Sequence, residues 1–381
     1  MHKSNLPEIV CEGSPYEMGY AQGKWLKPHA DGILRALIDN KYVPRWFKMA
    51  GLPTLKSLLT LKGFQVRNKH FANIWKSSPD QFERLRGIAE GSGMKLTLLL
   101  GMMAVETMLA TFKYVMGCTS LGVGKERSKT RSPMIGYNHD FPDFLKQELI
   151  VRRSRPKQGH ASVQLTYPTL PGSICGVNAA GLAVTLNHAF SIEPHNDGVP
   201  PTFLVQHVLD FCGTAEEAAE VFKHTKFANG SMATVADADG GLYALELARG
   251  RFGVRKPKHG ISLTLNEYQI PDLKEIEVPQ DAVFHPKKYP KFFEGLAIHQ
   301  PNWERKRRFA KLLDEEKKLT DKDVKRLLSD HNGHRDGAVG SICRHHATSD
   351  TIATAVVYPK EGVLEVSRGF ACQAKYQTFE V

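Results

Sequence analysis

The 381-residue sequence lacks the features that mark membrane and secreted proteins. No apolar run reaches the ~18 uninterrupted residues that a membrane-spanning helix needs, and the nearest, LTLLLGMMAVETMLATF, contains Glu106. The start, MHKSNLPEIV, has no apolar region typical of a secretory signal. Low-complexity tracts and fixed-period repeats are missing as well, and 41% of the residues are hydrophobic. These absences predict a folded protein of the cytoplasm with no membrane partner.

Paired cysteine motifs are also missing. The six cysteines are widely spaced and include no Cys-x-x-Cys pair, at Cys11, Cys118, Cys175, Cys212, Cys343 and Cys372. This spacing is typical of a reducing compartment and not of a disulfide framework. Cys11, Cys175, Cys212 and Cys372 are expected to be core residues, the usual place of free cysteines.

A metal or cofactor motif is not evident either. The segment DHNGHRDG…SICRHH contains His331, His334, Cys343, His345 and His346, but this spacing fits no familiar zinc pattern. The two glycines of GVNAAGLAV do not have the spacing of a phosphate loop and favour a tight turn. We therefore expect no metal and no cofactor, and we expect the histidines to line a loop near a pocket.

Positive charge is in excess, with a net charge of +11. The basic clusters GKERSKTR, VRRSRPK, RKPKHG and ERKRRF are scattered along the chain and lack interleaved aromatic residues. No helix-turn-helix, finger or RNA-platform signature accompanies them, which argues against a nucleic-acid partner. A solvated basic face is predicted, which would suit an acidic substrate or one that carries coenzyme A.

Apolar periodicity divides the chain near Cys118. Up to about residue 116 the spacing of three and four residues predicts helices, and Ser14 with Glu17 forms a capping box at the start of one of them. After Cys118 the period approaches two, which predicts a meander of antiparallel strands. Helices are expected at residues 202–211, 214–225, 303–318 and 321–331, and a hairpin is expected across PKEG. The pattern favours a layered α+β architecture.

The stretch VMGCTSLGV contains the most informative cysteine. If CTSLGV and MIGYNHD form a hairpin whose turn is centred near Lys129, Cys118 lies opposite Asp140, while His139 points to the other face. A thiol beside a carboxylate still lacks a base. Cleavage of the Gly117–Cys118 bond would supply one, because a free α-amine has a reference pKa of ~7.7–8.0. A glycine at 117 would leave its carbonyl open to attack by the next residue's thiol.

Seven motifs spread over nearly the whole chain carry a resemblance to a known family, and they occur in the expected order. They are GSPYEMGYAQG, RGIAEGSGM, GCTSLGV, GYNHD, GVNAAGLAVTLNHAF, TLNEY and SICRH. The sequence resembles the acyl-CoA:6-aminopenicillanate (isopenicillin-N) acyltransferases, which are autoprocessing cysteine N-terminal nucleophile (Ntn) hydrolases. The resemblance implies a four-layer αββα sandwich of antiparallel sheets. It also implies a precursor that cuts itself before a cysteine, which then becomes the new N-terminus.

The resemblance assigns roles to individual residues. It makes Cys118 the nucleophile of both self-cleavage, at Gly117–Cys118, and catalysis, with its freed amine as the general base. Asp140 would orient that amine, Asn266 would be an oxyanion-hole residue, and Asn187 would line the same pocket. The bland alternatives are a buried core cysteine, an aspartate that caps a turn, and asparagines that satisfy backbone groups at strand ends.

Substrate contacts are less defined by the sequence. Where the penicillin-forming enzyme has a serine-arginine pair, ATSDTIATAVV has Thr348 and Ser349 and no arginine. Arg344 is then the nearest candidate for a substrate-facing cation, and Asn138 and His345 are further candidates for substrate binding. The missing arginine argues against activity on penicillins.

Together these observations predict one Ntn-hydrolase domain made of two segments. Residues 1–117 form a mainly helical pro or alpha segment, and residues 118–381 form the catalytic beta segment. The two fragments are expected to stay associated and to cleave a linear amide, or to transfer its acyl group, through a Cys118 thioester. The partner would be a small-molecule amide or acyl donor. Alternatives are a CoA-dependent N-acyltransferase, with acyl-CoA as a substrate, and an unprocessed anion-binding protein of the same fold.

Overall fold

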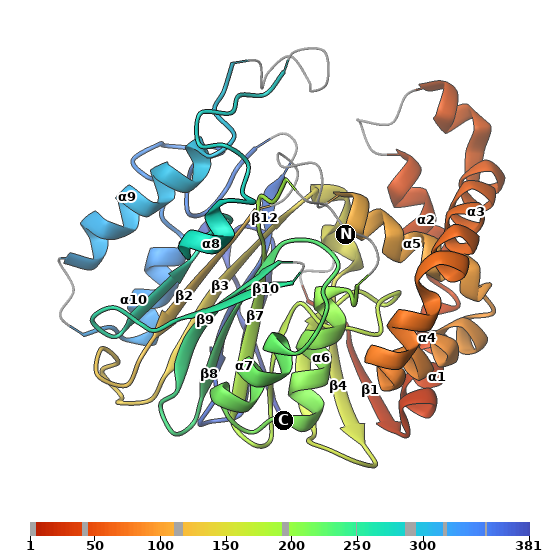
Figure 1. The fold of residues 1–381 in the computed structure, drawn as a ribbon, viewed down its shortest axis with the longest axis horizontal. Coiled ribbons are helices and arrows are strands. Elements are labelled where there is room, and N and C mark those ends of the chain that lie inside the picture. Colours follow the sequence, from red (N-terminus) through yellow and green to blue (C-terminus); the bar gives the residue numbers. More distant parts are fainter. Residues whose placement is uncertain are drawn as a thin grey trace.

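Two β-sheets lie face to face at the centre of the protein (Figure 1). The structure is a computed structural model that describes residues 5–39, 45–109, 117–192, 198–248, 250–285, 295–314, 318–346 and 349–381. The larger sheet has eight strands in the order β1-β4-β5-β6-β7-β8-β9-β10, and the smaller has six in the order β11-β2-β3-β12-β13-β14. All neighbouring strands are antiparallel except β1 and β4, which are parallel.

The strands follow the alternating sequence pattern closely. Their bounds are β1 Glu8–Gly13, β2 Gly117–Val123, β3 Met134–Phe141, β4 Ile150–Pro156, β5 Ser162–Thr166, β6 Cys175–Asn178, β7 Leu182–His188, β8 Ser231–Asp237, β9 Leu242–Ala248, β10 Arg251–Arg255, β11 Ile261–Thr264, β12 Asp350–Tyr358, β13 Val363–Arg368 and β14 Gln377–Glu380. Consecutive strands from β4 to β10 pair in chain order, so the predicted meander is confirmed. The hairpin across PKEG joins β12 to β13, also as predicted.

Helices cover both outer faces of the paired sheets. Their bounds are α1 Pro15–Leu26, α2 Ala30–Asp39, α3 Arg45–Ser77, α4 Pro79–Ser92, α5 Leu96–Leu109, α6 Pro201–Phe211, α7 Ala215–Lys223, α8 Pro271–Lys274, α9 Gln300–Asp314 and α10 Asp321–Leu328, with 3-10 turns η1 Asp143–Glu148 and η3 Ala371–Gln373. Helices α6 and α7 pack on the eight-stranded sheet, and α10 packs on β3 and β12 of the six-stranded sheet. Among the described residues, none of the helices combines the length and apolar character needed to cross a membrane.

The result is the predicted four-layer αββα sandwich. Between the sheets, Ile135 and Tyr137 of β3 pack with Val163 of β5 and Val177 of β6. On the outer face of the smaller sheet, Phe309 of α9 joins the core formed by β2 and α10. Both faces of β2 and β3 are therefore covered, and every residue of these two strands is buried. A reactive group on β2 is thus enclosed between a helix layer and the second sheet.

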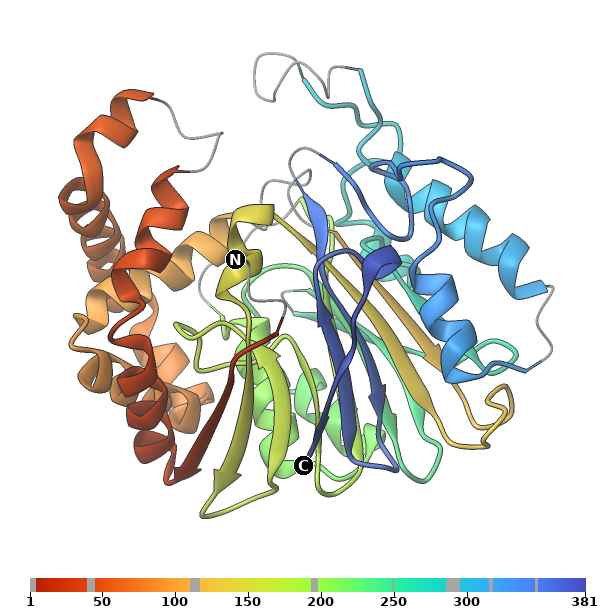
Figure 2. The same ribbon diagram turned by 180° about the vertical axis from the view of Figure 1, so that it is seen from behind.

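The N-terminal helices lie beside the sheets, on the side opposite α9 and α10 (Figures 1 and 2). Helix α1 begins with the predicted capping box, in which Ser14 and Glu17 bond each other's backbone N–H groups. Helices α1 and α4 approach so closely that a β-carbon at Gly19 would meet the backbone of Arg84. Strand β1 was not predicted from the sequence; it precedes α1 and extends the larger sheet by pairing with β4.

Candidate active site

The register of β2 and β3 determines which side chains meet at Cys118. Gly117 lies opposite Asp140, and Cys118 lies opposite His139. The predicted pairing of Cys118 with Asp140 is therefore wrong by one residue. Residues directly opposite in an antiparallel pair point to the same face, so Cys118 and His139 face the second sheet together, whereas Asp140 faces the helix layer with Gly117.

The Cys118 thiol is enclosed by two side chains of β3 and is only 1% exposed. Its Sγ lies 3.4 Å from Tyr137 Oη and 3.8 Å from His139 Nδ1. Tyr137 Oη is also 2.7 Å from the Leu186 carbonyl oxygen, which can only accept, so the tyrosine proton is donated there. The Cys118 S–H is therefore the donor toward Tyr137 Oη or His139 Nδ1.

Burial keeps the thiol and the imidazole uncharged. It raises the pKa of Cys118 to about 12, an effect to which the nearby Asp140 charge adds. It also lowers the pKa of His139 to about 3, because a buried imidazolium loses its hydration. Near neutral pH the intact chain thus holds a neutral thiol beside a neutral imidazole. The predicted register put His139 on the other face, so its contact with the thiol was not expected from the sequence.

On the helix-facing side, Asp140 lies between two arginines beside Gly117. Its Oδ1 accepts a 2.7 Å hydrogen bond from Thr351 Oγ1, and its Oδ2 lies 3.6 Å from Arg305 Nη1. Burial raises the pKa of Asp140, while the charges of Arg305 and Arg344 oppose that rise. A β-carbon added at Gly117 would lie 2.5 Å from Nη1 of Arg344, so only glycine fits there without movement of this buried arginine.

Asn266 and Arg305 hold the backbone of Cys118 itself. Asn266 Oδ1 accepts from the Cys118 N–H at 3.2 Å and from Arg305 Nη2 at 2.9 Å, while its Nδ2 donates to the His188 carbonyl oxygen. Arg305 Nη1 donates to the Cys118 carbonyl oxygen at 2.8 Å. The nitrogen that self-cleavage would free is thus already bound to the side chain of Asn266.

Arg305 is a site residue that sequence reasoning missed. It belongs to the basic cluster ERKRRF of α9, for which the sequence predicts a solvated face, yet it is 1% exposed. Two neighbours in the cluster behave differently: Lys306 is half exposed, and Arg308 pairs with Asp330. Only the helical position of Arg305, facing the sheet, could have distinguished it, and the sequence alone did not reveal that orientation.

Asn187 lies near the site, but its amide is fully occupied. Its Nδ2 donates to the carbonyl oxygens of Thr264 and Leu265, at 3.1 and 3.2 Å, and its Oδ1 accepts from Ser120 Oγ at 2.6 Å. These bonds join β7 to β2 and to the end of β11. In this arrangement no Asn187 proton remains for an oxyanion.

The proposed substrate-binding residues are not brought together. Asn138 faces the helix layer, where its Nδ2 donates to the carbonyl oxygens of Leu328 and Ile342. His345 stacks on Phe370, with ring centroids 3.8 Å apart. Of the three, only Arg344 is placed next to Asp140 and Gly117. Thr348 lies outside the described residues.

An apolar pocket opens on the side of Tyr137 and His139 that faces away from the helix layer. Its wall is contributed by α2, α5, β3, η1 and the segment after β5, and its lining residues are mainly hydrophobic: Ile33, Leu37, Met102, Phe141, Leu145, Tyr167, Pro168, Leu170, Ile174 and Leu186. The polar groups His139, Glu148, Thr169, His188 and Thr202 complete it. Tyr137 and His139, which line the pocket, both contact Cys118 Sγ, so these two side chains lie between the pocket and the thiol.

The model of the acyl-coenzyme A:6-aminopenicillanic acid acyl-transferase family matches residues 126–369, well over half of the chain. The chain belongs to this family. The matched range contains Asp140, Asn187, Asn266 and Arg305, and it begins after Cys118. The family match therefore includes the residues that surround Cys118 but not Cys118 itself.

The chain also resembles one protein sequence and several solved structures, at low sequence identity. An uncharacterized protein of Archaeoglobus fulgidus is 23% identical over 298 residues, which are 71% of this chain and 48% of that protein, so the chain spans about half the length of this relative. Two solved structures each cover 69% of this chain with a TM-score of 0.43. They are the Caenorhabditis elegans ortholog of N-acylethanolamine-hydrolyzing acid amidase, at 15% identity over 100% of that chain, and a single-residue variant of conjugated bile acid hydrolase from Clostridium perfringens, at 11% over 97%.

Proposed function

We propose that this protein is a cysteine Ntn hydrolase or acyltransferase that cuts its own chain before Cys118 and then cleaves a linear amide. The observation that carries the proposal is the setting of the Gly117–Cys118 peptide. A carboxylate and a guanidinium lie beside Gly117, and the Cys118 nitrogen is bound by Asn266. Membership of an acyl-transferring family supports chemistry at an amide carbonyl.

Self-cleavage would proceed as a shift of the Gly117 acyl group. Sγ of Cys118 attacks the Gly117 carbonyl carbon, the C–N bond to Cys118 breaks, and a thioester forms while the new amine receives the thiol proton. Water then hydrolyses the thioester, leaving a Gly117 carboxylate and Cys118 with a free thiol and amine. In the intact chain His139 lies 3.8 Å from Sγ and can relay the proton. The Arg344 charge beside Gly117 lowers the energy of the oxyanion that forms on this carbonyl.

After cleavage, the freed amine takes over as base. Its reference pKa of ~7.7–8.0 allows it to accept the thiol proton near neutral pH. Asn266 Oδ1, already 3.2 Å from this nitrogen, keeps it in place, and Asp140 lies on the Gly117 side of it. The thiol then attacks the substrate carbonyl, the substrate amine departs with a proton, and the thioester passes the acyl group to water or to an acceptor amine.

Extensive contacts between the two fragments should keep them associated after cleavage. Strand β1 of the first fragment pairs with β4 of the second along its whole length. Buried polar contacts add to this pairing: Gln22 Oε1 accepts from Arg152 at 2.8 Å, and Arg84 pairs with Asp210 at 3.0 Å with both side chains at most 3% exposed. Cleavage in our proposal therefore changes the chemistry at Cys118 and leaves the fold assembled.

The pocket favours a substrate with an apolar acyl group. Its hydrophobic wall lies next to Tyr137 and His139, so an acyl chain seated there brings its carbonyl toward Cys118 Sγ. An anion-binding role finds less support, because Arg305 and Arg344 are buried and their charges act on the Asp140 carboxylate. Acyl transfer from coenzyme A remains the second candidate, favoured by the family match.

A substrate panel tests this proposal. N-acyl amino acids, acyl-amines, β-alanyl amides and penicillins would be assayed for released amine, with Cys118→Ala as the inactive control. Acyl-CoA with an acceptor amine would form a separate arm. Leu145→Trp, at the half-buried rim of the pocket, should reduce turnover of long acyl chains more than that of acetyl amides. The exposed Val254→Trp should change neither. Thiol-independent turnover, or equal loss for short and long chains, would contradict the proposal.

A further inference from the structure

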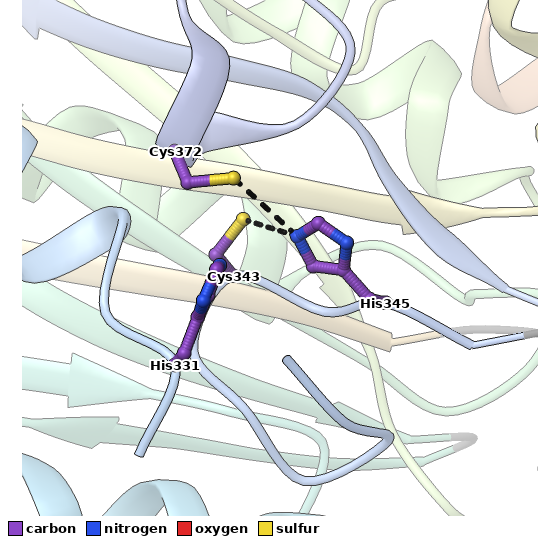
Figure 3. Close-up of side chains that lie close together, drawn as sticks. All are labelled: His331, Cys343, His345 and Cys372. Atoms are coloured by element: carbon purple, nitrogen blue, oxygen red, sulfur yellow. Dashed lines mark hydrogen bonds between the residues drawn. The ribbon is translucent and has the colours of Figure 1, made fainter. Parts of the chain in front are cut away.

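Two histidines and two cysteines meet outside the candidate active site, between the loop after α10 and the turn η3. They are His331, Cys343, His345 and Cys372, and one potential ligand atom from each lies within 4.8 Å of all the others. Figure 3 shows both sulfurs directed toward the same nitrogen of His345. Neither Cys343 nor Cys372 is in a disulfide.

The distances suit a tetrahedral metal ion. Sγ of Cys343 is 3.4 Å and Sγ of Cys372 is 3.5 Å from His345 Nε2. Zn–S bonds of ~2.3 Å and Zn–N bonds of ~2.0–2.1 Å in a tetrahedron place sulfur and nitrogen about 3.6 Å apart. Two thiolates and two imidazoles are also a ligand set that zinc prefers in structural sites.

One ring nitrogen of His331 is hydrogen-bonded to the backbone, and the other is available to bind a metal ion. Its Nδ1 lies 3.3 Å from the Arg335 carbonyl oxygen, which can only accept, so Nδ1 carries the proton. Its Nε2 is buried and has no hydrogen-bond partner among the residues that the structure describes. A backbone carbonyl that fixes the tautomer of a histidine, and leaves the second nitrogen free, is the usual support of a metal ligand.

The loop that carries three of the four residues is held in shape by its own backbone. The Cys343 N–H donates to the Asp330 carbonyl oxygen at 2.9 Å, and the His345 N–H donates to that of Ala338 at 3.3 Å. Gly337 has a φ of +77°, and a β-carbon there would lie 2.6 Å from the His345 ring. The ligands on this loop are therefore positioned before any ion binds.

We propose that His331, Cys343, His345 and Cys372 form a structural Zn²⁺ site that fastens the 331–345 loop to the turn η3. Four protein ligands leave no open coordination position, so the ion would serve structure and not catalysis. The site departs from the expectation of no metal, because Cys372 lies far along the chain and its approach is visible only in the fold. Arg344 stands between two of the ligands, so the ion would also fix the backbone that places this arginine beside Gly117.

Metal analysis of the purified full-length chain tests this site. The Cys118→Ala background keeps the chain uncut, so the result does not depend on the proposed self-cleavage. Protein produced with zinc in the medium and desalted should contain about one Zn²⁺ per chain. His331→Asn and Cys372→Ser should each lose most of it, whereas His334→Asn, an exposed histidine of the same loop, should retain it.

Two further measurements keep the result decisive if a variant loses zinc by misfolding. Co²⁺ added to protein stripped of its metal by a chelator should give the absorption of a tetrahedral cobalt ion with thiolate ligands. This absorption should be missing in Cys372→Ser, provided that the circular dichroism of the variant matches that of the parent. Chelation should lower the Tm of the parent and leave that of Cys372→Ser unchanged. Zinc content far below stoichiometric, equal zinc in parent and variants, or a Cys343–Cys372 disulfide in the native mass spectrum would overturn the proposal.

Discussion

Cys118 on β2 lies directly opposite His139 on β3, with Sγ 3.8 Å from Nδ1. The pair is buried and uncharged, because burial raises the pKa of the thiol to about 12 and lowers that of the imidazole to about 3. The intact chain is therefore in a resting state with a weakly nucleophilic thiol. Cleavage, in our proposal, replaces this imidazole with the amine of Cys118 as the working base.

Acid should destabilise the protein through His139. Its pKa of about 3 when folded is below its ordinary value of about 6.5 in the unfolded chain, so the unfolded state binds more protons between these values. The stabilisation is complete above pH ~6.5 and is lost as pH falls toward 3, at up to about 1.4 kcal/mol per pH unit. Urea unfolding of Cys118→Ala across this range should give a steeper pH dependence than Cys118→Ala with His139→Gln. His334→Gln, at an exposed position, serves as the control, and equal slopes for all three would refute the expectation.

Gly117→Ala should slow self-cleavage. Its β-carbon would lie 2.5 Å from Arg344 Nη1, and this buried arginine must then move away from the scissile peptide. Overpacking of this kind costs about 1–3 kcal/mol. Gly32→Ala is the matched control, since a β-carbon there has no neighbour within 4 Å among the described residues. Time courses of the intact mass after expression would show the difference. Cleavage of Gly117→Ala at the normal rate would mean that self-cleavage does not require Arg344 beside Gly117.

Replacing Asn266 should mainly reduce reaction rates, whereas replacing Asn187 should mainly reduce the stability of the fold. Asn266→Ala removes the acceptor that holds the Cys118 nitrogen, the base of our proposal, and that also binds Arg305; we expect self-cleavage to slow and turnover to fall by up to roughly 10²–10⁴ without vanishing. Asn187→Ala removes bonds to two backbone carbonyls and should lower the free energy of unfolding by about 1–3 kcal/mol with a smaller effect on rate. Cleavage rates and urea midpoints measured on both variants test this division. Equal slowing by the two would argue against it.

Asp210→Asn should weaken the association of the two fragments. Asp210 accepts from Arg84 at 3.0 Å, and removing its charge leaves a buried arginine uncompensated, at a cost of about 3–5 kcal/mol. After cleavage, the small fragment should be lost from the variant at lower urea concentration than from the parent, as followed by size-exclusion chromatography. The exposed Asp143→Asn is the control. Unchanged co-elution would show that the β1–β4 pairing and the remaining contacts, such as that of Gln22 with Arg152, hold the fragments together without this ion pair.

Local patterns in the sequence were enough to predict most elements. The capping box at Ser14, the helices that begin near residues 202, 214 and 321, and the meander after Cys118 are where periodicity and turn residues placed them. Strand β1 was missed although EIVCEG alternates between exposed and buried positions, because six residues are too few to outweigh the helical pattern that follows.

Register and long-range contacts were not predictable in the same way. The loop between β2 and β3 could have had its centre at Lys129, but the strands pair about a point between Ser128 and Lys129, and this half-residue difference exchanges Asp140 for His139 opposite Cys118. The approach of Arg305 to Cys118 and of Cys372 to His345 joins segments far apart in the chain. Such contacts depend on how the layers pack, which no local pattern encodes.

The intact mass of the purified protein under denaturing conditions tests the central claim most directly. We predict two pieces for the parent, residues 1–117 and 118–381, and a single uncut chain for Cys118→Ala. A parent protein that is folded by circular dichroism, remains one chain of full mass and shows no thiol-dependent turnover would contradict the account.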